Sequence, residues 1–145
     1  GWMGALKLAL LAQKLYKFSG GGAQILKNIN RVIYACDISY EAKIHPSCHL
    51  AHQGLGVVIG AGSEIGRDTI VRQNVTIGGK NVNGQFVCPI IGENVMIGAG
   101  TVILGEVRIG NNVQIGANSV VLDDVPDNVT VVGAPARIVN KERKG

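Results

Sequence analysis

The chain has 145 residues, of which 46% are hydrophobic and 17% are charged. This length supports one compact core with little room for a second domain, and the apolar content argues against intrinsic disorder. No apolar run reaches the roughly 20 residues that a membrane-spanning helix needs. Aromatic residues make up only 4%, so Ile, Val and Leu must fill the core, which argues against an aromatic-rich sandwich. We therefore expect one folded domain with appendages.

The net charge of +4 arises from 14 Lys and Arg against 10 Asp and Glu, and much of the excess lies near the two ends of the chain. Aromatic residues are not interleaved with these cations, so nucleic acid is not expected as a partner. The apolar start is interrupted by Lys7 and has no small-residue cleavage site after it, so a signal peptide is not expected either. Cys36, Cys48 and Cys88 form no Cys-x-x-Cys pair, which favours three unreactive thiols in the reducing cytoplasm.

Two helices are predicted at the start of the chain. Residues 3–18 combine helix-forming residues with a leucine-rich face, and Gly20-Gly21-Gly22 is expected to end this helix. A second helix over residues 24–35 has one apolar face formed by Ile25, Leu26, Ile29, Val32 and Ile33. We expect that face to pack over the open end of the domain that follows, because packing is the usual fate of an apolar face. The alternative is a basic amphipathic helix that lies on a membrane surface.

From Ile59 onward an aliphatic residue recurs every six positions. Glycine usually follows it, and a small or β-branched residue lies four positions after it. Each hexad is therefore predicted to form one short flat strand followed by a corner, where glycine supplies dihedral freedom and lacks a Cβ. Three hexads would close a triangular coil, and stacked coils would bury a continuous aliphatic column. The repeated positions are Ile59, Ile65, Val71, Ile77, Ile91, Ile97, Ile103, Ile109, Ile115 and Val121.

The same phase extends upstream through Ile38, Ile44 and Leu50, and it is interrupted twice. Three extra residues fall around Gly54-Leu55-Gly56. Eight extra residues, polar and glycine-containing, lie within residues 79–90. Because loops on rigid scaffolds commonly carry function, we expect the longer insertion to be exposed and to border the functional site.

Two motifs accompany the repeat, Val75-Thr76-Ile77-Gly78-Gly79 and Val132-Gly133-Ala134-Pro135-Ala136-Arg137. With them, residues 36–139 resemble the serine acetyltransferase branch of the hexapeptide-repeat acyltransferases. The resemblance implies an all-β solenoid in the form of a left-handed parallel β-helix, a homotrimer, and acetyl-CoA bound as acyl donor in the groove between neighbouring subunits. It divides the chain into a helical N-terminal extension (1–36), the β-helix with its inserted loop 79–90 (37–125), and a C-terminal segment that closes the acyl-CoA site (126–145).

Acyl transfer to a hydroxyl needs a base that takes the hydroxyl proton. Of the three histidines, His52 is the best candidate because it lies beside the first interruption, where a side chain can point outward. Asp37 lies 15 residues earlier, close to one coil, so it is positioned to orient His52. Serine acetyltransferases have a His/Asp pair at this separation, so the resemblance implies both roles. The alternatives are an exposed corner residue for His52 and a cap between helix and coil for Asp37.

The resemblance assigns acyl-CoA binding to backbone and side chains at Gly78, Gly79, Ala99, Ala117, Ala134 and Arg137. Lys141 and Arg143 are further candidates for the phosphates. The alternatives are corner geometry for the small residues and a surface charge for Arg137. Zinc is not expected, because His45, His49 and His52 are spaced by 4 and 3 residues and a flat hexad sends such side chains to different faces.

The acceptor is less clearly indicated. Serine acetyltransferases have Asp where this chain has Ala51, and they have Arg-His-Pro where it has Val87-Cys88-Pro89. In that family these positions bind the charged groups of the amino acid. A zwitterionic acceptor needs such charged or hydrogen-bonding partners in a desolvated site. A sugar hydroxyl in surface polysaccharide biosynthesis is therefore the rival to serine and cysteine biosynthesis. The chain ends in Lys-Gly rather than the terminal Ile that docks in cysteine synthase, so that partner is not expected. A trimeric scaffold without catalysis is the remaining alternative.

Overall fold

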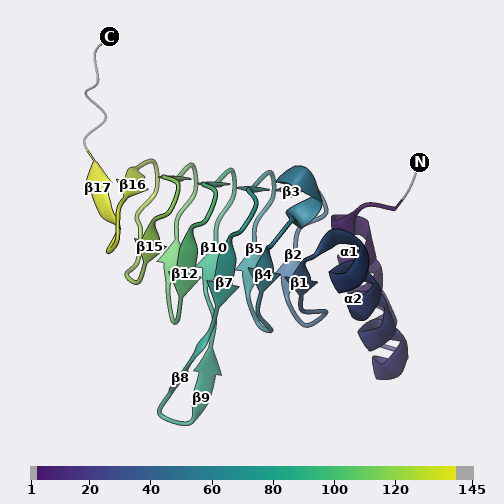
Figure 1. The fold of residues 1–145 in the computed structure, drawn as a ribbon. Coiled ribbons are helices and arrows are strands. Elements are labelled where there is room, and N and C mark those ends of the chain that lie inside the picture. The colour runs from purple at the N-terminus through teal and green to yellow at the C-terminus, as the bar shows by residue number, and fades with distance from the viewer. Residues whose placement is uncertain (1–2, 140–145) are drawn as a thin grey trace.

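The computed structural model describes residues 3–139. Two helices, α1 (Ala5–Tyr16) and α2 (Gly20–Tyr34), pack against each other at one end of a triangular β-solenoid (Figure 1). The coils stack along a single axis, so that every wall of the solenoid is a parallel sheet. The predicted parallel solenoid with a helical N-terminal extension is confirmed.

Three walls enclose the core, and each coil contributes one strand to each wall, except that the last coil meets the second wall only through a bridge between Ile109 and Val125. The first wall contains β1 (Asp37–Ile38), β4 (Val58–Ile59), β7 (Thr76–Gly78), β12 (Val102–Leu104) and β15 (Val120–Val121). The second contains β2 (Lys43–Ile44), β5 (Glu64–Ile65), β10 (Ile90–Ile91) and β13 (Arg108–Ile109). The third contains β3 (His49–Leu50), β6 (Ile70–Val71), β11 (Met96–Ile97), β14 (Gln114–Ile115) and β16 (Thr130–Val132), with β17 (Arg137–Val139) antiparallel to β16.

The six-residue period sets the register of these walls. In the first wall Ile59 pairs with both Ile38 and Ile77, and Ile103 pairs with Ile77 and Val121. All of these side chains are at most 2% exposed. The small residues four positions later, such as Ser63 and Thr101, are also buried and complete the column. The predicted aliphatic core is confirmed, including its upstream coil.

Several of the glycines that follow an inward aliphatic residue are required for space. A Cβ on Gly66 would lie 2.5 Å from the carbonyl oxygen of Gly92, and one on Gly98 would lie 2.6 Å from the nitrogen of Ala117 in the next coil. The prediction that these glycines supply the dihedral freedom of the corner is wrong. Positive φ angles occur two positions later, on residues whose short polar side chains tolerate that conformation: Asp68, Asn94, Asn112 and Asn118.

The helices differ from the prediction in two respects. The three glycines do not end the first helix; they open α2, because the Ser19 hydroxyl accepts a hydrogen bond from the Gly22 amide and caps it. The expected packing of the apolar face of α2 is also wrong, since Ile25 is 62% and Val32 85% exposed. The solenoid end is instead covered by α1, whose small buried residues Ala5 and Ala9 belong to the core cluster.

The long insertion is a β-hairpin, β8 (Lys80–Val82) and β9 (Gln85–Val87), which projects from the solenoid (Figure 1). Asn83 and Gly84 form its turn, both with positive φ, and the Asn81 side chain accepts a hydrogen bond from the Gly84 amide. The expectation of an exposed insertion is confirmed. Asn-Gly between two short strands is a strong hairpin signal that would have predicted the strands as well. Across residues 3–139, no helix has the length and apolarity to cross a bilayer.

Candidate functional site

The corner that joins the third wall to the first wall collects several of the predicted site residues. Hydrogen bonds between consecutive coils stack its segments: Asn74 N donates to Leu55 O at 2.8 Å, Gly100 N to Gln73 O at 3.1 Å, and Asn118 N to Ala99 O at 2.8 Å. The last coil joins through Val120 N, which donates to Gly133 O. We call this column the His52 corner; it comprises residues 51–57, 72–75, 98–101, 116–119 and 133–136.

The composition of the His52 corner is unusual for a surface. It contains no Asp or Glu, and its ionisable side chains are His52 and Arg72, both exposed. Ala99, Ala117 and Ala134 line it together with glycines, so most of its side chains are small. Such a surface is suited to an extended ligand with an anionic end.

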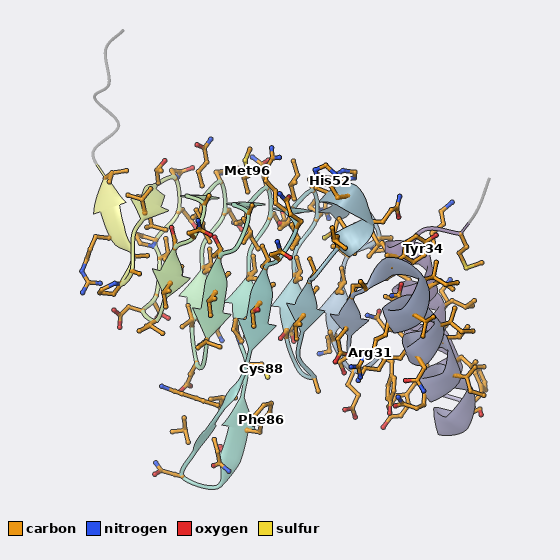
Figure 2. All side chains as sticks on the ribbon, viewed as in Figure 1. Arg31, Tyr34, His52, Phe86, Cys88 and Met96 are labelled. Carbon is orange, nitrogen blue, oxygen red and sulfur yellow. The ribbon has the colours of Figure 1, made fainter. Side chains whose placement is uncertain are left out.

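His52 itself lies in η1 (Ala51–Gly54), a short irregular turn formed by the three extra residues of the first interruption. Its φ is +52° and that of Gln53 is +57°, so two consecutive non-glycine residues adopt the left-handed conformation. Backbone conformations of this kind cost free energy and are found preferentially at functional sites. Figure 2 shows the His52 side chain at the outer edge of the coil, as the sequence predicted.

Gln53 stabilises this turn through α1. Its side-chain Oε1 accepts a hydrogen bond from the Ala5 amide at 3.2 Å, and this amide belongs to the first turn of a helix whose N-cap, Gly4, provides no side-chain cap. A Cβ on Gly4 would lie 2.7 Å from the same oxygen. The contact therefore links the N-terminus of α1 to the residue next to His52. Sequence reasoning missed Gln53, because a contact across 48 residues leaves no local pattern.

Asp37 is held by α2. Its Oδ1 lies 3.1 Å from Lys27 Nζ and its Oδ2 lies 3.9 Å from Arg31 Nη1. The Asp37 amide donates to the carbonyl oxygen of Val57 at 2.8 Å, so the Asp37 backbone adjoins the His52 corner. Both carboxylate oxygens lie within ion-pair distance of cations on α2, and these ion pairs attach the helix to the first coil.

The remaining predicted ligand residues are divided between two other places. Gly78 and Gly79 lie at the base of the hairpin, where a Cβ on Gly79 would lie 2.5 Å from the carbonyl oxygen of Val87. That close approach is sufficient reason for a glycine there. Arg137 lies at the end of the solenoid, 3.8 Å from the Asp123 carboxylate and largely exposed. Lys141 and Arg143 fall outside the residues that the structure describes.

The hairpin does not reach the His52 corner of its own chain. It begins after β7 and returns to β10, so it projects from the corner between the first and second walls (Figure 2). The expectation that the insertion borders the site therefore fails within a single chain. At its base, the Cys88 thiol donates to the carbonyl oxygen of Ala61 at 2.6 Å.

A polar side chain that the sequence did not single out also lies in the His52 corner. Gln73 is stacked one coil away from His52, and its Oε1 is buried with no hydrogen-bond partner among the described residues. An unpaired buried acceptor is costly, which makes Gln73 a candidate contact for a bound ligand with a hydroxyl or amide donor. The sequence does not single it out, because its neighbours Arg72 and Asn74 are polar as well.

No group of three or more potential metal-ligating side chains occurs within residues 3–139. His45 bonds to the Ser47 hydroxyl through Nδ1 at 2.8 Å, His49 lies on β3, and His52 lies in η1.

The thiols should be unreactive in the folded protein. Burial raises the pKa of Cys36 to about 11, with the nearby Asp37 carboxylate adding to the effect, and burial also raises the pKa of Cys48 and Cys88. The thiolate is the reactive form, so we expect a thiol reagent at neutral pH to modify the native protein far more slowly than the unfolded one. Raising the pH toward the pKa of Cys36 should increase its rate. Rapid modification of Cys36 or Cys48 at neutral pH would contradict the buried placement.

The chain is similar in sequence to a known family and to individual proteins. Residues 88–123 match the family described as bacterial transferase hexapeptide (six repeats). The serine acetyltransferase of Staphylococcus epidermidis is 43% identical over 134 residues, which is 92% of this chain and 62% of that protein. The resemblance to serine acetyltransferases is confirmed. The chain carries the hexapeptide repeat in the matched residues, and it spans about 62% of the length of the Staphylococcus serine acetyltransferases that it matches.

Solved structures agree. The serine acetyltransferase of Neisseria gonorrhoeae in complex with serine has a TM-score of 0.87 at 36% identity, covering 94% of this chain and 55% of that one. A serine acetyltransferase in complex with CoA has a TM-score of 0.84 at 38% identity, covering 93% and 55%. The structural similarity thus includes both the solenoid and the helices that precede it.

Proposed function

We propose that this chain is an acetyl-CoA-dependent O-acetyltransferase of the serine acetyltransferase type, built on a left-handed coil. The observation that supports the proposal most directly is the His52 corner. It combines an exposed histidine on a strained turn with a carboxylate-free surface of small residues that leads away from it. The similarity to serine acetyltransferases, one of which was solved with CoA, points to the same chemistry.

In the proposed reaction His52 acts as general base. Its imidazole takes the proton of the acceptor hydroxyl while that oxygen forms a bond to the thioester carbonyl carbon. The carbon–sulfur bond then breaks, and the CoA sulfur receives the proton from the imidazolium. The acetyl ester and free CoA are the products, and the base returns to its neutral form.

The acyl donor is proposed to lie along the His52 corner. Ala99, Ala117 and Ala134 let a pantetheine arm approach the backbone closely, and Arg72 provides an exposed cation in the same column. Gly78, Gly79 and Arg137 complete the donor site in this proposal. Gly78 and Gly79 lie at another corner of their own chain, so in this proposal they are contributed by a neighbouring copy, while Arg137 at the end of the solenoid contacts the far end of the donor.

A homotrimer accounts for the position of the hairpin. Within one chain the hairpin and His52 lie at different corners, whereas a threefold arrangement of triangular solenoids brings different corners of neighbouring copies together. We place the site in the groove between subunits, where residues 79–90 of one copy border the His52 corner of the next. We also assign the enzyme to the cytoplasm, where acetyl-CoA is available.

Serine is the first candidate acceptor, in line with the relative that was solved with serine. A specific observation favours a second one, a sugar hydroxyl. Serine carries an ammonium group that needs an anionic or hydrogen-bonding partner, and the His52 corner has no carboxylate, with Ala51 beside the base. Serine would therefore rely on groups from a neighbouring copy, while a neutral sugar would not.

The deciding experiment measures CoA release from acetyl-CoA with a thiol reagent, across L-serine, homoserine, free sugars and nucleotide sugars. Turnover with serine supports a role in cysteine biosynthesis; turnover with sugars alone supports polysaccharide modification. No turnover and no CoA binding by calorimetry would refute the enzymatic proposal and leave a trimeric scaffold. The unreactive thiols of the protein keep the background of this assay low.

Asp37 is proposed to orient His52 in the assembled enzyme. If so, Asp37→Asn should lower kcat by about tenfold or more, because the amide no longer stabilises the imidazolium. Lys27→Met is the matched control: it removes the ion pair at 3.1 Å but leaves the carboxylate. We expect Lys27→Met to retain kcat. If both variants lose activity and thermal stability together, Asp37 acts only by attaching α2.

A further inference from the structure

Asn83 and Gly84 form the tip of the β8–β9 hairpin, and together they carry a chemistry that the proposed function does not use. The backbone nitrogen of the residue after an asparagine can attack the side-chain carbonyl carbon and close a succinimide ring. A side chain on that following residue hinders the attack, and glycine has none. Asn83 is the only asparagine in the sequence that is followed by glycine. The hairpin tip is therefore the place where this reaction meets the least steric hindrance.

The tip also has the space that the reaction needs. Asn83 and Gly84 are both exposed, and a Cβ on Gly84 would have no atom within 4 Å. A succinimide ring can therefore form without a clash, and water can reach it from solvent. Asn118 offers the contrast, because the residue that follows it, Ser119, is also small. Ser119 is 0% exposed and its hydroxyl donates to the carbonyl oxygen of Gly116 at 2.6 Å, so this pair is fixed within a coil.

The hairpin has little support from the rest of the fold. Among the described strands, β8 and β9 pair only with each other. The one aromatic side chain of the hairpin, Phe86, is 63% exposed and adds little packing. An isolated two-stranded hairpin is at best marginally stable. The β8–β9 hairpin should therefore open locally at a smaller free energy than the stacked coils.

Asn81 holds the tip in its closed form. Its Oδ1 accepts a hydrogen bond from the Gly84 amide at 2.9 Å, and that amide nitrogen is the attacking atom. The nitrogen attacks only after it loses its proton, so a proton held by a carbonyl oxygen slows the reaction. The φ angles of Asn83 and Gly84, +50° and +81°, also belong to the closed turn. The reaction therefore proceeds through the opened hairpin, and the Asn81 hydrogen bond opposes that opening.

We propose that Asn83 is a site of spontaneous deamidation, which gives the hairpin tip a negative charge. The Gly84 nitrogen loses its proton and forms a bond to Cγ of Asn83. The bond between Cγ and the side-chain nitrogen breaks, and that nitrogen leaves as ammonia with the proton. Water then opens the succinimide at one of its two carbonyl carbons, which leaves aspartate or isoaspartate at position 83.

The product changes the hairpin in two ways. Isoaspartate routes the backbone through the former side chain, so the two-residue turn that pairs β8 with β9 is lost. Lys80 is the only charged residue within residues 79–90, so the new carboxylate cancels the charge of the hairpin. The proposal is independent of the acetyltransferase activity, because the modification is measured without donor or acceptor.

The test is incubation of the 145-residue chain at neutral pH, followed by peptide mapping with mass spectrometry. Replacement of the amide nitrogen by oxygen raises the mass of one peptide, and a carboxyl methyltransferase specific for isoaspartate labels that product. We expect Asn83 to be modified first and Asn118 to stay intact. Asn81→Ala should raise the rate about fivefold, because one hydrogen bond fewer closes the tip. Asn81→Asp is the matched control: it keeps an oxygen acceptor and should be no faster than the parent.

Asn83→Gln provides a second check, because its longer side chain would have to close a larger ring and should leave the hairpin unmodified. Circular dichroism verifies that each variant keeps the solenoid, which substitutions in the hairpin should not affect. Modification of Asn118 before Asn83 would overturn the proposal. An Asn81→Ala variant that reacts no faster than Asn81→Asp would overturn it as well, since the tip would then be closed by something other than this hydrogen bond.

Discussion

Replacing His52 with alanine should lower kcat by about 10² to 10⁴-fold, the usual contribution of a general base. The structure explains why the effect should be specific. His52 is exposed, and its backbone conformation is set by the turn and by the Gln53 contact to Ala5, so the imidazole is not needed for folding. The affinity for CoA, measured by calorimetry, should remain unchanged, because the alanine residues along the corner are not altered.

His45 provides the control for this prediction. It is also exposed, but it bonds to Ser47 and lies at a different corner of the same coil. His45→Ala should therefore retain kcat within a small factor. A His52→Ala enzyme with near-parental turnover on its best acceptor, or an equal loss in His45→Ala, would show that the base is another group.

The solenoid was predictable because its pattern is local. Every inward side chain from Ile59 to Val121 follows from a period of six, and the two interruptions of that period became η1 and the hairpin. The reason for the glycines was not predictable in the same way. The contact that excludes a Cβ on Gly66 comes from Gly92, in the next coil, and a single hexad contains no information about its neighbour.

The helices show where sequence periodicity fails. Both are amphipathic, and hydrophobicity alone favoured α2 as the cover of the solenoid. The first coil is covered by α1 instead, because its alanines at positions 5 and 9 allow a close approach to the core. Close packing depends on shape as much as on apolarity. The apolar face of α2 is then left exposed, although its pattern predicted a packed face.

The candidate site could be predicted only where its signal in the sequence is local. The position of His52 followed from the interruption at Gly54-Leu55-Gly56, which is a local signal. The partner of Asp37 depended on how α2 docks, and its ion pair with Lys27 at 3.1 Å joins residues of two different elements. Gln53 and Gln73 act through contacts between coils or with α1, so a single sequence gave no indication of either.

The second large effect concerns stability. Ile97→Ala should lower the free energy of unfolding by about 2–5 kcal/mol, because the side chain is fully buried and its removal leaves a cavity in the aliphatic column. Ile97 pairs with Val71 on one side and Ile115 on the other, so both neighbouring coils lose contacts. Chemical denaturation followed by circular dichroism measures the change.

Met96 is a matched control because it precedes Ile97 on the same strand and points to the opposite side (Figure 2). It is 36% exposed, so Met96→Ala should cost less than about 1 kcal/mol, since surface substitutions away from special features have small effects. The difference between two adjacent residues tests the six-residue period itself. Equal destabilisation by both variants would mean that Met96 is also buried, as it would be if the third wall formed a contact between subunits.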